Sequence, residues 1–165
     1  MAKNRRFAPV LLILPLVISL VFLHCFLMPT DPDYWWHVTT GRYIVETGAI
    51  PQTDPFSYTS LGKEWTAHEW LSEVLFCGTE RAFGYVGNVV LFGIILCLIW
   101  YIVYRIARDR GIGELGAAFC ATLWFIMARS SLNVRPQVWT VLLFSLTVFI
   151  LQRYLLDHRG KLWPL

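Results

Sequence analysis

Two aspartates, Asp31 and Asp33, stand on either side of Pro32 directly after an apolar run, and their type and spacing favour chemistry. A carboxylate at the edge of a low-dielectric region can have a raised pKa and can act as a base near neutral pH. His37 follows Asp33 by one helical turn, so we expect the imidazole to face that carboxylate. The alternative is structural: Asp33 caps a helix and Asp31 lies in a solvated turn.

Two further groups of polar residues are candidates for binding. His68 and Glu69 are adjacent, although Glu69 also suits a helix cap, and Glu73 follows one turn later. Arg129 and Arg135 lie near the ends of apolar segments, where a guanidinium needs water or a partner and where its planar fork suits phosphate. For these arginines the alternative is interfacial snorkelling or pairing with acids of the chain.

The sequence lacks the short motifs of several enzyme classes. No Walker A, G-x-G-x-x-G, H-E-x-x-H or G-x-S-x-G pattern is present, which argues against nucleotide hydrolysis, zinc proteolysis and α/β-hydrolase chemistry. No C-x-x-C or Cys/His ligand spacing exists either, so we expect no structural zinc site and assign no metal ligands. Nothing indicates a divalent metal cofactor, and metal dependence stays undecided. Four cysteines are expected to be buried free thiols: Cys25, Cys77, Cys97 and Cys120.

Long apolar segments must position these residues. The chain has 165 residues, of which 56% are hydrophobic and only 15% are charged, an unusual balance for a soluble domain. Residues 7–28 and 82–104 contain no Asp, Glu, Lys or Arg, and each run can cross a ~30 Å hydrocarbon core as a helix. We predict an all-α integral membrane protein, one membrane domain with four transmembrane helices. Their predicted positions are residues 7–28, 85–104, 113–131 and 136–154.

The distribution of lysine and arginine predicts the orientation. Basic clusters precede the first predicted span and follow the second and the fourth. Four alternating helices place all three clusters on one side, which the positive-inside rule identifies as the cytoplasm. The N-terminus is then cytoplasmic in a multi-pass protein of the cell membrane, and residues 29–82 form a large first loop outside. This topology accounts for the net charge of +3, which therefore does not point to nucleic acid.

The outer loop is rich in aromatic residues and carries two predicted amphipathic helices beside the membrane. The first starts with Asp33 as its N-cap and runs to about Thr47, where Gly48 closes it. One face of this helix is predicted to hold five residues: Trp36, Thr40, Tyr43, Ile44 and Thr47. The second helix is predicted to begin at Thr66 with a capping box to Glu69. Its apolar face would lie towards the lipid and would hold Trp70, Leu71, Val74 and Leu75.

An ordered series of motifs in this loop resembles the pattern of one enzyme family. The series comprises Asp31-Pro32-Asp33-Tyr34-Trp35-Trp36-His37, Gly41-Arg42-Tyr43-Ile44, Gly48-Ala49-Ile50-Pro51, Asp54-Pro55-Phe56-Ser57-Tyr58, Trp65 and His68-Glu69-Trp70-Leu71-Ser72-Glu73, with Arg135-Pro136-Gln137 further along. It is similar to bacterial GT-C membrane glycosyltransferases, relatives of protein O-mannosyltransferases and of the lipid A aminoarabinose transferase. The resemblance covers residues 5–165.

The resemblance implies transfer of a sugar from a polyprenyl-phosphate carrier in the bilayer to a lipid, glycan or protein acceptor outside the cytoplasm. An acidic residue of the first outer loop, Asp33 or Asp31 here, would orient or deprotonate the acceptor hydroxyl. Arg129 or Arg135 would hold the departing lipid phosphate. The remaining motif residues expected at the donor and acceptor sites are His37, His68 and Glu69.

The family also implies a longer protein, because such enzymes have many more spans. We therefore expect residues 1–165 to be the N-terminal part of a GT-C module, with residues 161–165 leading into a further span. Two other classes compete with this interpretation. One is a non-catalytic membrane subunit or scaffold; the other is a small transporter, although spans one and two offer few polar residues: Ser19 and Gly93, with Asn88 near an end.

Overall fold

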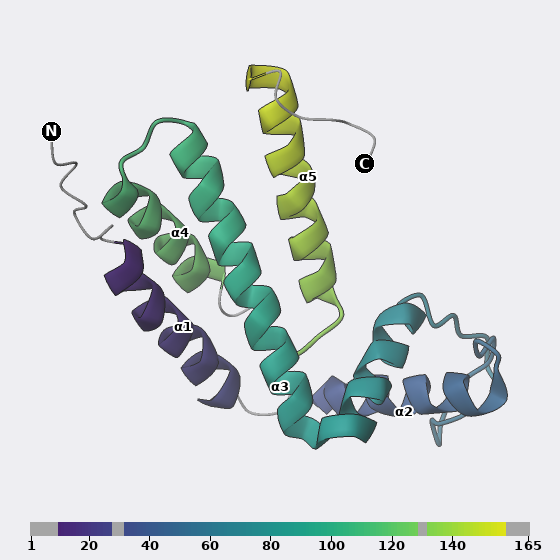
Figure 1. The fold of residues 1–165 in the computed structure, drawn as a ribbon. Coiled ribbons are helices and arrows are strands. Elements are labelled where there is room, and N and C mark those ends of the chain that lie inside the picture. Colours follow the sequence, from purple (N-terminus) through teal and green to yellow (C-terminus); the bar gives the residue numbers. More distant parts are fainter. Residues whose placement is uncertain (1–9, 28–31, 129–131, 158–165) are drawn as a thin grey trace, which may run out of the picture. The chain divides into compact units, whose positions relative to one another are not determined.

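A computed structural model describes residues 10–27, 32–128 and 132–157 of the chain (Figure 1). These residues contain five α-helices: α1 (Val10–Leu27), α2 (Pro32–Thr47), α3 (Trp70–Asp109), α4 (Glu114–Ala128) and α5 (Gln137–Asp157). The described part of the chain has no strand, only an isolated antiparallel bridge between Thr53 and Glu64 in the connection from α2 to α3. The all-α prediction is confirmed.

The chain divides into two compact units. The helix unit comprises residues 1–29, 90–133 and 137–165, and the loop unit comprises residues 30–89 and 134–136. The loop unit therefore includes α2 and the first part of α3, and it covers the predicted outer loop together with the turn that contains Arg135. Each unit is described by itself below.

Apolar packing holds the helix unit together. Val21 of α1 and Phe92, Ile99 and Trp100 of α3 are at most 1% exposed. The side of α4 that is buried carries alanines, Ala117, Ala118 and Ala121, and small residues let helices approach closely where lipid offers no hydrophobic drive. The Trp100 indole Nε1 donates a hydrogen bond of 3.2 Å to the Thr122 hydroxyl, so α3 and α4 also share a polar contact.

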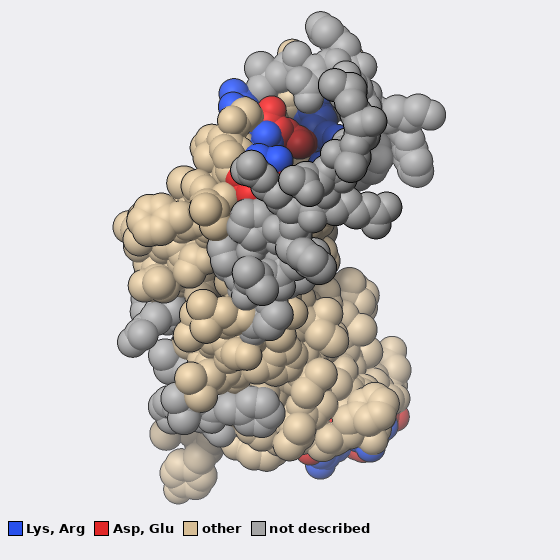
Figure 2. Space-filling model, turned by 60° about the vertical axis from the view of Figure 1, so that its left-hand side comes forward, with Lys and Arg blue, Asp and Glu red and all other residues tan. Residues whose placement is uncertain are grey.

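Charged side chains of the helix unit collect at one end. Gln152 on α5 donates to the carbonyl of Ile106 on α3 at 3.2 Å, and Arg153 lies 3.3 Å from Asp109, so the C-terminal ends of α3 and α5 adjoin. Arg108 pairs with Glu114 at the start of α4. Figure 2 shows blue and red atoms gathered in the upper part of the view and at its lower right edge, with a tan surface of uncharged residues between them. That surface suits contact with hydrocarbon.

Two helices are long and apolar enough to cross a membrane, α3 and the segment Gln137–Leu155 of α5, which weakly indicates membrane association. The predicted first and third spans correspond to α1 and α4. Their apolar described segments, Leu16–Cys25 and Glu114–Ala128, are shorter. The 15 residues of α4 cover about 22 Å, less than a ~30 Å hydrocarbon core. The four-span topology and its orientation therefore stay predictions.

Helix α2 ends where its sequence predicts. The Gly48 amide donates to the Ile44 carbonyl at 2.9 Å, and Gly48 has a φ of 68°, the left-handed conformation in which glycine closes helices. The face predicted to hold Trp36, Thr40, Tyr43, Ile44 and Thr47 coincides only in part with the face that is buried. The buried residues of α2 are Tyr34, His37, Val38, Thr40, Gly41 and Ile44. Trp36 and Tyr43 are half-buried because they contact the following loop, and Thr47 is exposed.

Helix α3 begins at Trp70, so the predicted start at Thr66 was wrong. Residues 66–69 form turns instead, in which the His68 amide bonds the Thr66 carbonyl at 2.9 Å. The Glu69 carbonyl accepts the Glu73 amide at 3.1 Å, which makes Glu69 itself the residue from which the helix starts. The predicted apolar face is exposed at Trp70, Leu71 and Leu75, while its contact with lipid stays a prediction.

A break at Gly84 divides α3. Gly84 has φ 66° and ψ −169°, a conformation open essentially to glycine alone. Residues 76 and 88 would lie about 18 Å apart along a straight helix. Instead, the Asn88 amide donates to the Phe76 carbonyl at 3.1 Å, so the chain folds back at the glycine.

Candidate functional site

Close packing of α2 on the first part of α3 creates the site. The enabling residue is Gly41, because a Cβ built there would collide with the backbone carbonyl of Glu73 and lie 3.0 Å from Cys77 Cβ. Glycine at this position therefore permits a backbone approach that any larger residue forbids. His37 lies one turn before Gly41 on the same buried face, so the approach brings its imidazole against the carboxylates of α3.

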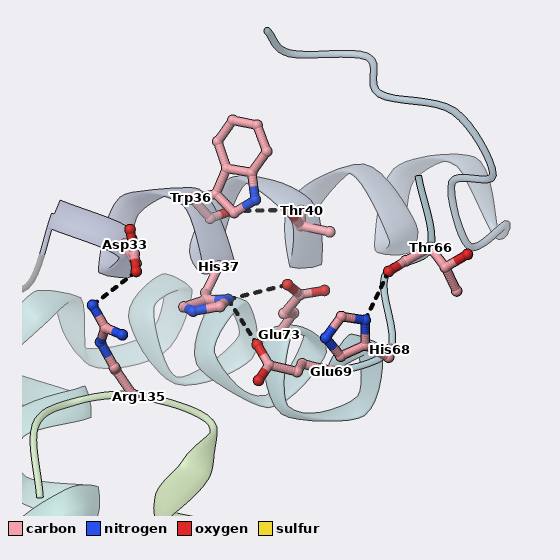
Figure 3. Close-up of polar contacts among 9 residues, drawn as sticks. All are labelled: Asp33, Trp36, His37, Thr40, Thr66, His68, Glu69, Glu73 and Arg135. Atoms are coloured by element: carbon pink, nitrogen blue, oxygen red, sulfur yellow. Dashed lines mark hydrogen bonds and ion pairs between the residues drawn. The ribbon is translucent and has the colours of Figure 1, made fainter. Parts of the chain in front are cut away.

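A buried histidine and two glutamates converge at this contact (Figure 3). The Nδ1 atom of His37 lies 3.1 Å from Oε1 of Glu73 and 3.7 Å from Oε2 of Glu69. The Glu73 side chain is 3% exposed, whereas that of Glu69 is 29% exposed. The potential ligand atoms of the three residues all lie within 4.8 Å of one another, so this cluster is the place in the described chain where a metal ion could be held.

The ring of Phe76, fully buried, stands edge-on to the His37 imidazole with 6.2 Å between centroids. This contact and the hydrogen bond to Glu73 fix the plane of the imidazole. The loop unit therefore holds the His37 imidazole in a defined orientation beside the two glutamates.

Asp33 has a different partner. Its Oδ2 lies 2.8 Å from a terminal nitrogen of Arg135, and the side chains are 55% and 38% exposed (Figure 3). The structure thus joins the first turn of α2 to the short connection before α5. This ion pair is also what the structural alternative for Arg135, pairing with an acid of the chain, predicts, and the site itself stays a prediction. The expected pairing of Asp33 with His37 is replaced by separate partners, because the buried face of α2 turns His37 towards Glu73.

Tyr34 and Asn88 form a buried hydrogen bond beside the cluster. The Asn88 amide donates to the Tyr34 hydroxyl at 2.8 Å and both residues are fully buried. Burial raises the pKa of the Tyr34 phenol, and the hydrogen bond from Asn88 opposes that effect. These two residues fix α2 against α3 on the far side of Gly84, so their role is to position the site.

Aromatic residues attach the loop to the other side of α2. The Trp36 ring lies edge-on to Phe56 at 5.2 Å and to Trp65 at 5.7 Å, and Tyr43 approaches Phe56 at 6.1 Å. Asp54 closes the turn that carries Phe56: its Oδ1 accepts the amides of Phe56 at 2.8 Å and Ser57 at 2.9 Å. Hydrogen bonds from the Ser57 hydroxyl and amide and from the Phe56 amide lower the pKa of Asp54.

The other predicted site residues have mixed outcomes. Asp31 and Arg129 lie outside the described residues. His68 is exposed, and its Nδ1 approaches the Thr66 carbonyl at 3.0 Å, a contact within its own turn. Glu69 both starts α3 and reaches His37. The structure thus brings together His37 with Glu69, and Asp33 with Arg135.

Sequence reasoning named Glu73 only as a weaker candidate and assigned it no role in the site. The sequence signal for Glu73 was its position: it is a second acidic side chain one helical turn after Glu69, and the apolar residues of the helix occupy another face. Nothing local reveals that this carboxylate is buried, because its burial depends on Gly41 in the preceding helix. The four cysteines are free, as predicted; Cys25 and Cys77 are buried, whereas Cys97 is half-buried and Cys120 is exposed.

Comparison of the chain with protein families, with curated proteins and with solved structures gave no match. The function must therefore be argued from the residues of the loop unit.

Proposed function

We propose that the chain is the N-terminal part of a membrane glycosyltransferase that moves a sugar from a polyprenyl-phosphate-linked donor to an extracytoplasmic acceptor. The observation that supports this proposal is the contact of Asp33 with Arg135. A carboxylate of the kind needed to accept a proton and a guanidinium of the kind needed to hold a phosphate lie 2.8 Å apart and are both partly exposed. They come from separate parts of the sequence, as residues of a shared site do.

The proposed reaction needs a base and an anion-binding group. As the acceptor hydroxyl attacks the anomeric carbon, its proton passes to Asp33 while the bond from that carbon to the phosphate oxygen breaks. The lipid phosphate leaves with the bonding electrons and gains negative charge. A guanidinium carries five N–H donors in a planar fork, so Arg135 can bridge the Asp33 carboxylate and a phosphate at the same time.

The membrane setting supports the choice of donor. A lipid-linked sugar reaches the outer leaflet without a nucleotide, and its phosphate lies at the depth of the membrane interface. Within the proposal, the loop unit lies outside the cytoplasm and α3 and α5 are among the spans of a multi-pass protein of the cell membrane. The exposed apolar side chains at the start of α3 would contact that interface.

The decisive experiment removes the charge of Asp33. Membranes that contain the full-length protein are incubated with synthetic polyprenyl-phosphate-linked hexoses and pentoses, and the release of polyprenyl phosphate is measured. Asp33→Asn is expected to lower the rate about 100-fold or more, because a general base contributes roughly that much. Glu46→Gln is the matched control: Glu46 is an exposed acid of the same helix that pairs with Arg81, so its rate should stay near that of the wild type.

Unchanged release in both Asp33→Asn and Asp31→Asn would remove the carboxylate mechanism. No release from any donor by the wild-type protein would remove the transferase proposal itself.

A non-catalytic membrane module is the second candidate, and one observation favours it. Many motif residues already have structural roles: Tyr34 bonds Asn88, Gly41 permits close packing and Asp54 closes a turn. This alternative predicts that purified protein binds no polyprenyl phosphate. The transporter alternative has less support, since Asn88, its best polar residue near a span, is engaged by Tyr34 and Phe76.

A further inference from the structure

The cluster of His37, Glu69 and Glu73 has more acceptor oxygens than its hydrogen bonds can use. The Nδ1 atom of an imidazole carries at most one proton, yet carboxylates of two residues converge on it, at 3.1 Å and 3.7 Å. Among the described residues, Oε2 of Glu73 has no hydrogen-bond partner although it is buried. A buried carboxylate oxygen left without a partner is costly, so this atom points to a missing partner.

No basic side chain supplies that partner within the described chain. The ion pairs of Glu69 and Glu73 there are both with His37, whereas the arginines of the loop unit pair with other acids: Arg42 with Glu80, Arg81 with Glu46 and Arg135 with Asp33. Two carboxylates and one imidazole therefore face one another, and no lysine or arginine balances the negative charge of the carboxylates. A bound cation would supply that balance.

Two of the three distances between the ligand atoms are close to those around a small divalent ion, and all three are within 4.8 Å. An ion at 2.0–2.2 Å from each of two ligands, with the usual angle between 90° and 109°, places those ligands about 2.8–3.6 Å apart. The distance of 3.1 Å from His37 Nδ1 to Oε1 of Glu73 falls within that range. A carboxylate that binds an ion through both oxygens would also give the unpartnered Oε2 its partner. The distance of 3.7 Å to Glu69 needs only a small rotation of a side chain that is 29% exposed.

We propose that His37 Nδ1, Glu69 and Glu73 bind one divalent cation of the zinc type, with a further coordination position open towards the exposed side of Glu69. Imidazole together with carboxylates selects Zn²⁺ or Mn²⁺ over Mg²⁺ and Ca²⁺, which prefer oxygen ligands throughout. Three protein ligands leave a fourth position for water or another oxygen ligand. The site is argued separately from the proposed glycosyl transfer, because Asp33 and Arg135 are not among its ligands, although the resemblance places His37 and Glu69 at the donor and acceptor sites.

The test measures metal binding directly. The full chain is purified in detergent and stripped with a chelator, and ZnCl₂, MnCl₂ and MgCl₂ are titrated in separate calorimetric experiments. We expect one equivalent of Zn²⁺ to bind most tightly and Mg²⁺ most weakly. Glu73→Gln keeps the shape and hydrogen-bonding capacity of the side chain, and it should weaken Zn²⁺ binding at least tenfold. Glu80→Gln is the matched control on the same helix and should bind like the wild type.

A spectroscopic readout covers the case in which Glu73→Gln fails to fold. Co²⁺ added to the stripped wild-type chain should give the visible bands of a low-coordinate ion, and Zn²⁺ should displace them with one equivalent. Absence of Zn²⁺ binding by the wild type, or equal binding by a folded Glu73→Gln variant, would overturn the site. Metal binding without sugar transfer would remove the proposed function and leave the site standing.

Discussion

Different kinds of contact stabilise the interior of each of the two units. In the helix unit, alanines and large apolar side chains pack in the interior, where Trp100 donates to Thr122. The polar contacts of Gln152, Arg153 and Arg108 lie at one end of the unit. In the loop unit, a glycine, a tyrosine–asparagine hydrogen bond and an Asx turn each fix one geometry. Directional contacts tolerate little change, so the loop unit can hold catalytic or metal-binding atoms in place, and substitutions in the two units should differ in effect.

Gly41→Ala should have the largest effect. The new Cβ meets the backbone carbonyl of Glu73, which cannot rotate away, so α2 must move from α3 at a cost of about 3 kcal/mol. The control is Gly78→Ala on α3, where a Cβ meets nothing within 4 Å and the gain in helix propensity is about 1 kcal/mol. Thermal unfolding in detergent measures both. Equal midpoints for the two variants would contradict the close approach at Gly41.

Asn88→Ala should have the next largest effect. It removes the donor to the Tyr34 hydroxyl and to the Phe76 carbonyl in a fully buried place, which costs about 2 kcal/mol. Combining it with Tyr34→Phe should cost less than the sum of the single changes, because both remove the same hydrogen bond. Strict additivity in the unfolding midpoints would show that the bond contributes nothing.

Gly93→Ala tests the helix unit in the same way that Gly41→Ala tests the loop unit. Here the new Cβ lies 2.7 Å from Phe22 Cε1, the far end of a side chain that can turn away. We expect a loss of about 1 kcal/mol at most, partly offset by helix propensity. Adding Phe22→Leu should restore the unfolding midpoint of the wild type. A loss as large as that of Gly41→Ala would remove the contrast between the units.

Protonation of Asp54 should give the smallest change in stability, and this change should be visible only at acidic pH. Its pKa is lowered in the folded chain, so its contribution to stability is present above the ordinary carboxyl pKa and is lost as the pH falls through the lowered value. Limited proteolysis of residues 50–65 should therefore accelerate as the pH drops into that range. Asp54→Asn has no charge to lose, and the difference between its pH profile and that of the wild type isolates this carboxyl. Identical profiles would exclude the effect.

The sequence predicted local features well where a single residue type determines them. Gly48 follows the last turn of α2 as expected, whereas the predicted N-cap at Asp33 was wrong: α2 begins at Pro32, so Asp33 lies within its first turn. The start of α3 was placed too early because Thr66 and Glu69 match a capping box in spacing. The chain instead uses the carbonyls of Thr66 and Ala67 in turns before the helix begins.

The candidate site was predicted in part. The structure places Asp33 and Arg135 in contact, which fits the expected shared site and equally the alternative in which Arg135 pairs with an acid of the chain. The partnership of His37 with Glu73 could not be predicted, because it joins residues 36 positions apart and depends on which face of each helix is buried. Hydrophobic patterning of α2 pointed to Trp36 and Tyr43, whereas the face against α3 is set by Gly41, a residue with no hydrophobic signal.

The glycine conformation at position 84 constrains where the chain may gain or lose residues. Since that backbone geometry is open to glycine alone, the bend cannot migrate to a neighbouring position. One residue inserted between Glu73 and Gly84 would rotate everything upstream by about 100° around the helix axis relative to the bend. Asn88 would then meet a different carbonyl from that of Phe76, and the register between the two halves of α3 would be lost. The geometry of the site therefore requires the eleven-residue spacing from Glu73 to Gly84 as well as its side chains.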